Sequence, residues 1–219
     1  MGRRKRKFNR SLDRAARGLG LPRYFELFER TRFVLAGSSV LWLFKESLRG
    51  GGYVRYTLFG RAIKLVRGVK PVLNPEYGKA WLYAKFSFHP YTGETRVYIE
   101  DILAYPRSIH VGSYMMNVFI RFLRDWDRFF FVKEVYGELS VVDERDPLNR
   151  VRRDAFFRGF GFRIEEEGTK EKLGRYVKAG IEDLREKELP DVLEFSPEDV
   201  FLYLGERLAL WNFLGEGNE

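Results

Sequence analysis

The sequence predicts an α/β fold of the α+β type, in which a sheet is flanked by helices. Two observations carry this prediction. The segments "KAWLYAKFSF" (79–88) and "RVYIEDILAY" (96–105) flank "HPYTGET", whose Pro90 and Gly93 suit a hairpin turn. A helical pattern over 112–127 then precedes "RFFFVKEVYGELS" (128–140), an aromatic and β-branched run typical of a buried strand.

The remaining elements follow from spacing and turn residues. The stretch 21–48 predicts one or two helices broken near Gly37, and "YVRYTLF" and "AIKLVRG" predict a pair of strands around Gly60. A second clear helix is expected over 147–159, followed by the strand "GFRIEEE" at 161–167. Two terminal helices are expected over 169–188 and 197–214, the second with Ser196 as its cap.

The length of 219 residues suits one main domain with appendages. We expect a basic arm and helical region over 1–50, a core over 51–166 and an acidic helical extension over 167–219. The charge is unevenly distributed along the chain. Residues 1–32 hold eleven basic and three acidic side chains, residues 33–163 hold 21 and 13, and residues 164–219 hold 7 and 15. The net charge of +8 is therefore the sum of a basic N-terminal part and an acidic C-terminal part.

The run "RRKRK" has no apolar face to bury and is expected to be solvated. It comprises Arg3, Arg4, Lys5, Arg6 and Lys7. One interpretation is an arm that binds the phosphates of a nucleic acid. The other is a solubilising tail, or one that pairs with the acidic C-terminal third.

Composition excludes several classes of function. The chain has no cysteine, which removes disulfides, thiolate zinc sites and cysteine nucleophiles, and with two histidines we expect no metal site. Its longest uncharged apolar run, residues 33–44, is too short to cross a bilayer, so a cytoplasmic location is expected. Abundant Arg, Lys and Glu resemble the composition of proteins from hot environments.

The turn between the strand ending at Tyr105 and the helix beginning near Gly112 is a potential phosphate site. Unpaired backbone N–H groups and the helix dipole meet there. Its residues resemble the acetyl-CoA loop of the GNAT acyltransferase superfamily, R/Q-x-x-G-x-G/A followed by a helix. The six places are filled by Arg107, Ser108, Ile109, His110, Val111 and Gly112, and Ser113 continues into the helix. His110 stands where the family usually has glycine.

A second block extends the resemblance to roughly residues 77–166. In "LSVVDERDPLNRVRRDAFFRGFGFRI", Asn149, an aromatic pair and "GF" lie near the places expected after the family's fifth strand. The resemblance implies a mixed, mostly antiparallel sheet. It also implies that strands 95–105 and 129–139 part after a common start, so that the arm of acetyl-CoA pairs with the freed backbone. Arg107 to Ser113 and Asn149 would then contact the cofactor.

The implied reaction is attack of a neutral amine on a thioester, which needs a base and an acid. We expect Glu100 as the base and Asp101 as the alternate, because neighbouring strand residues point to opposite faces. An ion pair with an arginine is the structural alternative for Glu100, and Glu138 is a further candidate. Phe157 occupies the place of the family's thiolate-protonating tyrosine, so Tyr136, Tyr114 or water would take that role, or transfer has been lost.

Two functions follow from these observations. The first is an acetyl-CoA-dependent N-acetyltransferase whose acceptor is drawn to the basic front: a nucleic acid, a ribonucleoprotein, an aminoacyl-tRNA or a protein amine. The second is a catalytically degenerate protein of the same fold that binds DNA or RNA through residues 3–7. Attachment of the arm to an anionic membrane is a third alternative, for which "FNRSLDRAARGLGL" is only partly amphipathic.

Overall fold

The computed structural model describes residues 26–36, 40–50, 54–64, 72–73, 78–89, 91–105, 110–139, 146–169 and 172–195. The basic run 3–7, the loop residues 106–109 and the helix expected over 197–214 lie outside these ranges. Within them, no helix combines the length and apolarity that crossing a membrane requires.

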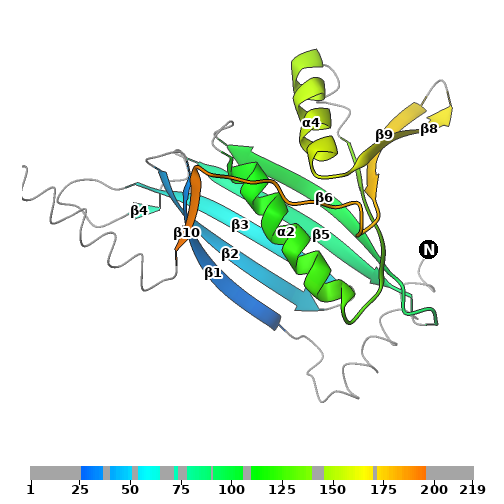
Figure 1. The fold of residues 1–219 in the computed structure, drawn as a ribbon, viewed down its shortest axis with the longest axis horizontal. Helices are drawn as coiled ribbons and strands as arrows, with labels where there is room; N and C mark the ends of the chain where they lie inside the picture. Colours follow the sequence, from blue (N-terminus) through cyan, green and yellow to red (C-terminus); the bar gives the residue numbers. More distant parts are fainter. Residues whose placement is uncertain are drawn as a thin grey trace, which may run out of the picture.

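The described residues form one ten-stranded sheet in the order β10-β1-β2-β3-β5-β6-β7-β9-β8, with β4 paired to β3 (Figure 1). The strands are β1 (Glu26–Ala36), β2 (Val40–Gly50), β3 (Val54–Lys64), β4 (Val72–Leu73), β5 (Lys79–Phe88), β6 (Thr95–Tyr105), β7 (Val132–Glu138), β8 (Arg163–Thr169), β9 (Lys172–Ala179) and β10 (Val192–Phe195). In this sheet β6 and β7 are parallel, and the other pairs are antiparallel. The mixed, mostly antiparallel α+β fold is thereby confirmed. The regions 1–50, 51–166 and 167–219 all contribute strands to this one sheet.

Two helices accompany the sheet at the ranges that the sequence predicts. Helix α2 (Val111–Asp127) connects β6 to β7, and α4 (Pro147–Gly159) connects β7 to β8. The N-cap of α4 is Asp146, whose side chain accepts hydrogen bonds from the backbone N–H groups of Leu148 and Asn149, and Pro147 follows at the first helical position. Asp146 and Pro147 therefore explain why α4 begins where it does.

One face of the sheet packs against α2, and we call it the core face. Tyr56 of β3 stacks on Phe122 at 4.6 Å between ring centroids, and Phe44 of β2 lies 5.2 Å from Tyr114. The opposite face, which we call the open face, carries the alternate residues of the same strands. The aromatic core expected from the composition thus lies between α2 and the strands.

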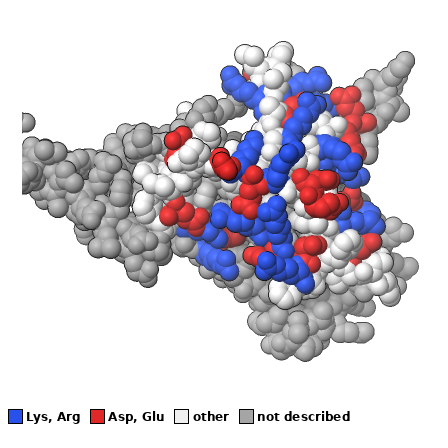
Figure 2. Space-filling model, viewed as in Figure 1, with Lys and Arg blue, Asp and Glu red and all other residues white. Residues whose placement is uncertain are grey.

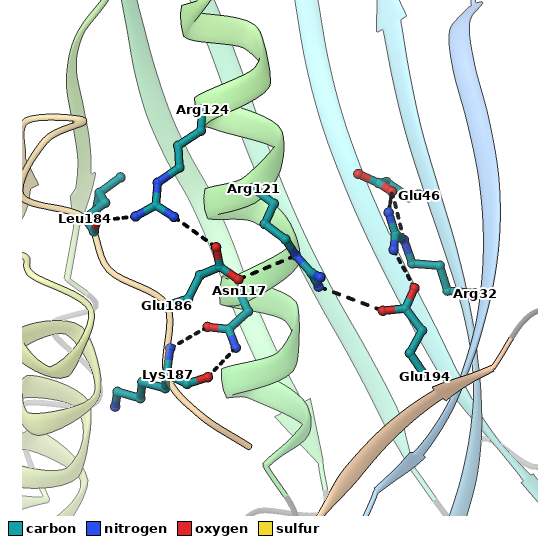
Figure 3. Close-up of polar contacts among 9 residues, drawn as sticks. All are labelled: Arg32, Glu46, Asn117, Arg121, Arg124, Leu184, Glu186, Lys187 and Glu194. Carbon is teal, nitrogen blue, oxygen red and sulfur yellow. Dashed lines mark hydrogen bonds and ion pairs between the residues drawn. The ribbon is translucent and has the colours of Figure 1, made fainter. Parts of the chain in front are cut away.

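Residues 180–191, which we call the strap, join β9 to β10 by passing across α2 (Figure 1). Asn117 of α2 donates to the backbone O of Lys187 (2.7 Å) and accepts from its N–H (2.9 Å). Arg124 donates to Leu184 O (2.9 Å) and pairs with Glu186 (2.9 Å), as Figure 3 shows. The helix is therefore held between the sheet and the strap.

A buried polar cluster joins β10, at one edge of the sheet, to its neighbours β1 and β2. Glu46, which is 2% exposed, accepts from the hydroxyl of Tyr56 (3.0 Å) and pairs with Arg32 (3.1 Å). Arg32 also pairs with Glu194 of β10. Burial, followed by the nearby Glu46 carboxylate, raises the pKa of Tyr56 well above its usual value. The phenol therefore stays protonated as the donor that Glu46 needs.

Several predicted elements are wrong. The helices expected over 21–48 are, from residue 26 onward, the strands β1 and β2, and the break at Gly37 lies between these strands. In β2, Leu41, Trp42 and Leu48 are all buried, so residues of both faces are covered. A continuous apolar run of this kind lacks the alternation that separates a strand from a buried helix.

Two further corrections concern strands. The pair expected around Gly60 is the single strand β3, in which a Cβ at Gly60 would collide with the ring of Phe44. The helix expected over 169–188 is β9 followed by the strap. The strand expected from residue 128 begins at Val132, and the side chains of Phe129 and Phe131 are 81% and 58% exposed rather than buried.

Candidate functional site

The pairing between β6 and β7 covers the first half of β6 and all of β7 except its last residue, Glu138. Their paired residues run from Thr95 and Val132 to Ile99 and Gly137. Beyond that last pair, which we call the vertex, residues 100–105 of β6 have no β7 partner in the described chain. The chain after β7 stays with β9 instead, because Leu139 N–H donates to Arg175 O (2.8 Å). The pairing thus ends after a common start, and the parting of the two strands that the resemblance implies stays a prediction, because residues 140–145 lie outside the described part of the chain.

Glycine is required at the vertex because the strands approach closely there. A Cβ on Gly137 would lie 3.0 Å from the carbonyl O of Ile99 and 3.2 Å from its Cβ. Both distances are shorter than ordinary carbon contacts. A side chain at this position would push β7 away from β6 and move the point at which their pairing ends.

A β-bulge in β6 lies directly beyond the vertex. Tyr83 of β5 pairs with Asp101 and the next residue, Ala84, pairs with Ile99, so Glu100 is the extra residue. A bulge shifts the alternation of side chains by one place. As a result Glu100 and Asp101 both lie on the open face, and the expectation that they point to opposite faces is wrong.

The contacts of the two acids agree with this placement. Glu100, whose side chain is 18% exposed, pairs with Arg55 (3.0 Å) and with Lys85, both on the open face. Asp101 accepts a hydrogen bond from the indole N–H of Trp81 (2.7 Å). The ion pair that the sequence left as the alternative role of Glu100 is therefore present.

Two tyrosines lie beside Glu100 at the vertex. Tyr136 pairs with Tyr98 in register, and their ring centroids are 5.2 Å apart. Burial raises the pKa of Tyr98, and Glu138, Tyr136 and Glu100 raise it further, in that order. We call Tyr98, Glu100, Tyr136 and Glu138 the vertex cluster. It contains both the expected base, Glu100, and one of the expected proton donors, Tyr136.

Sequence reasoning missed Tyr98 as a member of this group. The signal was present in the spacing, because Tyr98 precedes Glu100 by two residues and Tyr136 precedes Glu138 by two. A separation of two places both side chains on one face of a regular strand. The register between β6 and β7, which brings the two pairs together, is not visible in the sequence.

His110 is the N-cap of α2 and adopts the left-handed conformation, with φ of 60°. It is the single non-glycine residue with positive φ in the described part of the chain. Its carbonyl accepts the N–H of Tyr114 (2.8 Å), while its side chain makes no capping hydrogen bond. Glycine adopts this conformation without strain, which explains why the resembling family usually has glycine here.

The first turn of α2 is open to an anion. Val111 is buried and anchors the turn, whereas Ser113 is partly exposed. A Cβ on Gly112 would lie 3.5 Å from the Cβ of Ala104 and 3.7 Å from the ring of Phe156, in ordinary contact. No acidic side chain lies in this turn, so the partial positive charge of the helix start is not neutralised from within it.

Other expected residues lie farther away. Asn149 is in the first turn of α4, seven residues before Phe156 on the same helical face, about 10 Å along the axis. Phe157 is 4% exposed and packs on Phe162 in the core, so no proton donor stands at its position. Tyr114 is buried beneath α2 toward β2, three strands away from β6 in the sheet.

Charges are intermixed on the face of the molecule that carries α2. Figure 2 shows Lys and Arg side chains interleaved with Asp and Glu there. Acids of the C-terminal third pair with arginines of earlier elements, as in Arg124 with Glu186 and Arg32 with Glu194. The described residues contain no group of three His, Cys, Asp or Glu that is suited to a metal ion.

Comparison with known proteins gives only distant likenesses. No protein-family model matches the chain, and no curated protein does. Among solved structures, a chain of the NatC complex bound to Gag peptide and CoA is 12% identical with a TM-score of 0.35, over 63% of this chain and 71% of that chain. Nourseothricin acetyltransferase is 15% identical with a TM-score of 0.28, over 71% and 86%. TM-scores this low do not assign a function.

Proposed function

We propose that the protein is an acetyl-CoA-dependent N-acetyltransferase acting on an amine whose identity is open. The observation that carries the proposal is that the β6–β7 pairing ends at the Ile99–Gly137 pair while β6 continues to Tyr105. Residues 100–105 therefore present a strand edge that β7 does not pair with, close in sequence to the start of α2, and this edge is where we place the ligand.

The residues present fit acetyl-CoA in two places. Residues 100–105 of β6 offer a strand edge that β7 does not use, and the amide groups of a pantetheine arm are suited to pair with such an edge. The start of α2 offers unpaired N–H groups, and Gly112 leaves them approachable to a diphosphate. In this proposal Arg107 to Ser113 form the phosphate loop, and Asn149 of α4 is a further contact to the cofactor.

Bound acetyl-CoA supplies an acyl group activated as a thioester. The amine nitrogen forms a bond to the acyl carbon while the carbon–sulfur bond breaks, so one proton must leave the nitrogen and one must reach the sulfur. We assign the first transfer to Glu100, with Asp101 as the alternate, and the second to Tyr136. Their common position on the open face at the vertex supports this assignment.

Calorimetry with acetyl-CoA and two variants of one glycine tests the binding site. Gly112→Glu has room for its Cβ, and an acid in the first turn suits the helix dipole, so the fold is expected to survive. The carboxylate would repel a diphosphate, and we expect acetyl-CoA affinity to fall at least tenfold. Gly112→Ala is the matched control and should bind like the wild type. Ser113→Glu repeats the test should Gly112→Glu misfold.

Absence of binding to the wild type at millimolar acetyl-CoA would end the proposal, as would equal binding by Gly112→Glu. Turnover is measured by release of the CoA thiol with spermine and poly-L-lysine as model amines. Because the chain has no cysteine, a thiol reagent reports only the product.

The catalytic assignment is tested by Glu100→Gln and Tyr136→Phe. If Glu100 is the base, the glutamine variant loses about 100-fold or more in kcat while its affinity for acetyl-CoA is retained. If Glu100 only neutralises Arg55 and Lys85, the same variant melts at a lower temperature and its folded fraction keeps the wild-type kcat. Tyr136→Phe should lower kcat without changing the melting temperature, because the Tyr136 side chain is only partly buried and phenylalanine keeps its ring.

A further inference from the structure

The open face of β2, β3 and β5 is basic and aromatic, with no acidic residue from these three strands. Their one acid, Glu46, points to the core face. The residues on the open face are Leu41, Leu43, Lys45, Ser47, Arg49, Arg55, Thr57, Phe59, Arg61, Lys79, Trp81, Tyr83, Lys85 and Ser87. The separation of charge is a consequence of the two-residue period, because every Lys and Arg of these three strands with a described side chain falls on the same face.

Aromatic side chains form the centre of this face. Phe59 of β3 and Trp81 of β5 are paired across the two strands, and Tyr83 follows Trp81 on the same side. All three are only partly buried. Neighbouring strands are about 4.8 Å apart, so the exposed parts of these rings lie next to one another on one surface.

Exposed cations lie next to the rings. Arg61 and Lys79 form the adjacent cross-strand pair, and both are exposed. The Arg61 guanidinium lies 5.2 Å from the centre of the Phe59 ring, and the Lys79 ammonium lies 5.6 Å from that of Trp81. On the other side of the rings, Arg55 and Lys85 are paired with Glu100. On β3 and β5, the positive charge that is not shared with Glu100 therefore lies at the Arg61 and Lys79 end.

Neither α2 nor the strap covers this face. Both pack on the core face, as the contacts of Tyr56 with Phe122 and of Asn117 with Lys187 show. On β2, Leu41 and Ser47 of this face are themselves buried, so among the described residues the face is accessible mainly along β3 and β5.

We propose that this face binds single-stranded nucleic acid, and we call Phe59, Arg61, Lys79, Trp81 and Tyr83 the sheet platform. Aromatic rings beside cations recognise a polymer that alternates stackable bases with phosphates. A duplex hides its base faces and would meet only the cations. An anionic peptide would be drawn to the same cations, yet it has no repeated planar groups to match the row of rings.

Fluorescence anisotropy with a labelled twelve-nucleotide single strand tests the platform in the full-length protein. Trp81→Leu keeps an apolar side chain without a stacking face, and we expect the affinity to fall about 5- to 100-fold. Trp81→Phe restores a ring and should recover most of the affinity. Tyr83→Leu repeats the loss if Trp81→Leu does not fold, as judged by its melting temperature.

Charge reversal provides the second measurement. Arg61→Glu with Lys79→Glu should weaken binding at least tenfold. It should also reduce the dependence of log K on log salt by about 0.7 for each phosphate that is no longer neutralised. The matched control is Arg152→Glu with Arg158→Glu on α4, two exposed arginines away from the platform, which should bind like the wild type.

Three outcomes would overturn the proposal. These are no binding of the single strand at low salt, equal weakening by the α4 control, and displacement of the strand by poly-glutamate with Trp81→Leu unaffected. The last outcome would indicate an acidic protein partner. None of them bears on acetyl-CoA, which is measured separately with the Gly112 variants.

Discussion

At the scale of single residues, the left-handed backbone of His110 leads to a prediction about stability. A left-handed conformation costs an ordinary residue about 1–2 kcal/mol, and glycine avoids this cost while losing more freedom on folding. We expect His110→Gly to leave stability unchanged or raise it by up to about 1 kcal/mol in denaturant unfolding. His110→Ala keeps a Cβ and therefore the strain, so its stability should not rise above that of the wild type. A loss of several kcal/mol in the glycine variant would show that the imidazole itself stabilises the turn.

A second prediction at this scale concerns Asp154. Its carboxylate joins α4 to β9 through an ion pair with Arg175 (2.6 Å). Burial raises the pKa of this carboxyl, but the hydrogen bonds and charges of Arg175 and Arg153 outweigh that effect and lower it below its usual value. A carboxyl with a lowered folded pKa stabilises the fold above its unfolded pKa, near 3.9, and loses this contribution as pH falls through the folded pKa.

Asp154→Asn should therefore destabilise the protein by about 1–3 kcal/mol at pH 7 in urea unfolding. The difference from the wild type should shrink as the pH falls below about 4. Asp125→Asn is the control, because its side chain is 66% exposed and pairs only at the surface with Arg128. A gap between wild type and Asp154→Asn that stays constant down to about pH 2 would contradict the ionic origin of the effect.

At the scale of elements, the attachment of the strap to α2 depends on the side-chain amide of Asn117. Asn117 is 7% exposed and satisfies both backbone groups of Lys187. We expect Asn117→Leu to lower stability by about 1–3 kcal/mol, because two backbone groups lose their partners. Hydrogen exchange of residues 183–188 should become faster, while that of β5 and β6 stays protected. Glu186→Gln, which alters only the partly exposed ion pairs with Arg121 and Arg124, should cost less than about 1 kcal/mol.

The same scale shows what the sequence predicts and what it does not. The hairpin of β5 and β6, α2 and α4 are encoded locally by turn residues, caps and periodicity, and the structure has them at the predicted ranges. The sequence pattern of β1 and β2 predicts helices because burial on both faces of β2 removes the alternation of a strand. The β-bulge at Glu100 is a property of the pairing between β5 and β6, so the faces of Glu100 and Asp101 do not follow from their own strand alone.

At the scale of the whole molecule, the two proposals use different parts of one sheet. The proposed acetyl-CoA site lies where the pairing of β6 with β7 ends, and the sheet platform is on β3 and β5. Glu100 is the connection between them, because its carboxylate pairs with Arg55 of β3 and Lys85 of β5. This ion pairing holds Glu100 on the Arg55 and Lys85 side of the rings, whereas Asp101, the other acid of β6 on this face, accepts the indole N–H of Trp81. A nucleic acid bound there would lie beside the vertex cluster, where an acceptor amine would have to arrive.

Separate sites predict additive stabilisation by the two ligands. A ligand at about a hundred times its Kd stabilises the fold by about 2.7 kcal/mol, or roughly 5–10 °C in melting temperature for a domain of this size. We expect acetyl-CoA and a single-stranded oligonucleotide together to raise the melting temperature by the sum of their separate shifts. Gly112→Glu should abolish only the first shift and Trp81→Leu only the second, because each substitution removes a contact that only one of the two ligands is proposed to make. An oligonucleotide shift that disappears in saturating acetyl-CoA would show that its phosphates occupy the start of α2 instead of the sheet platform.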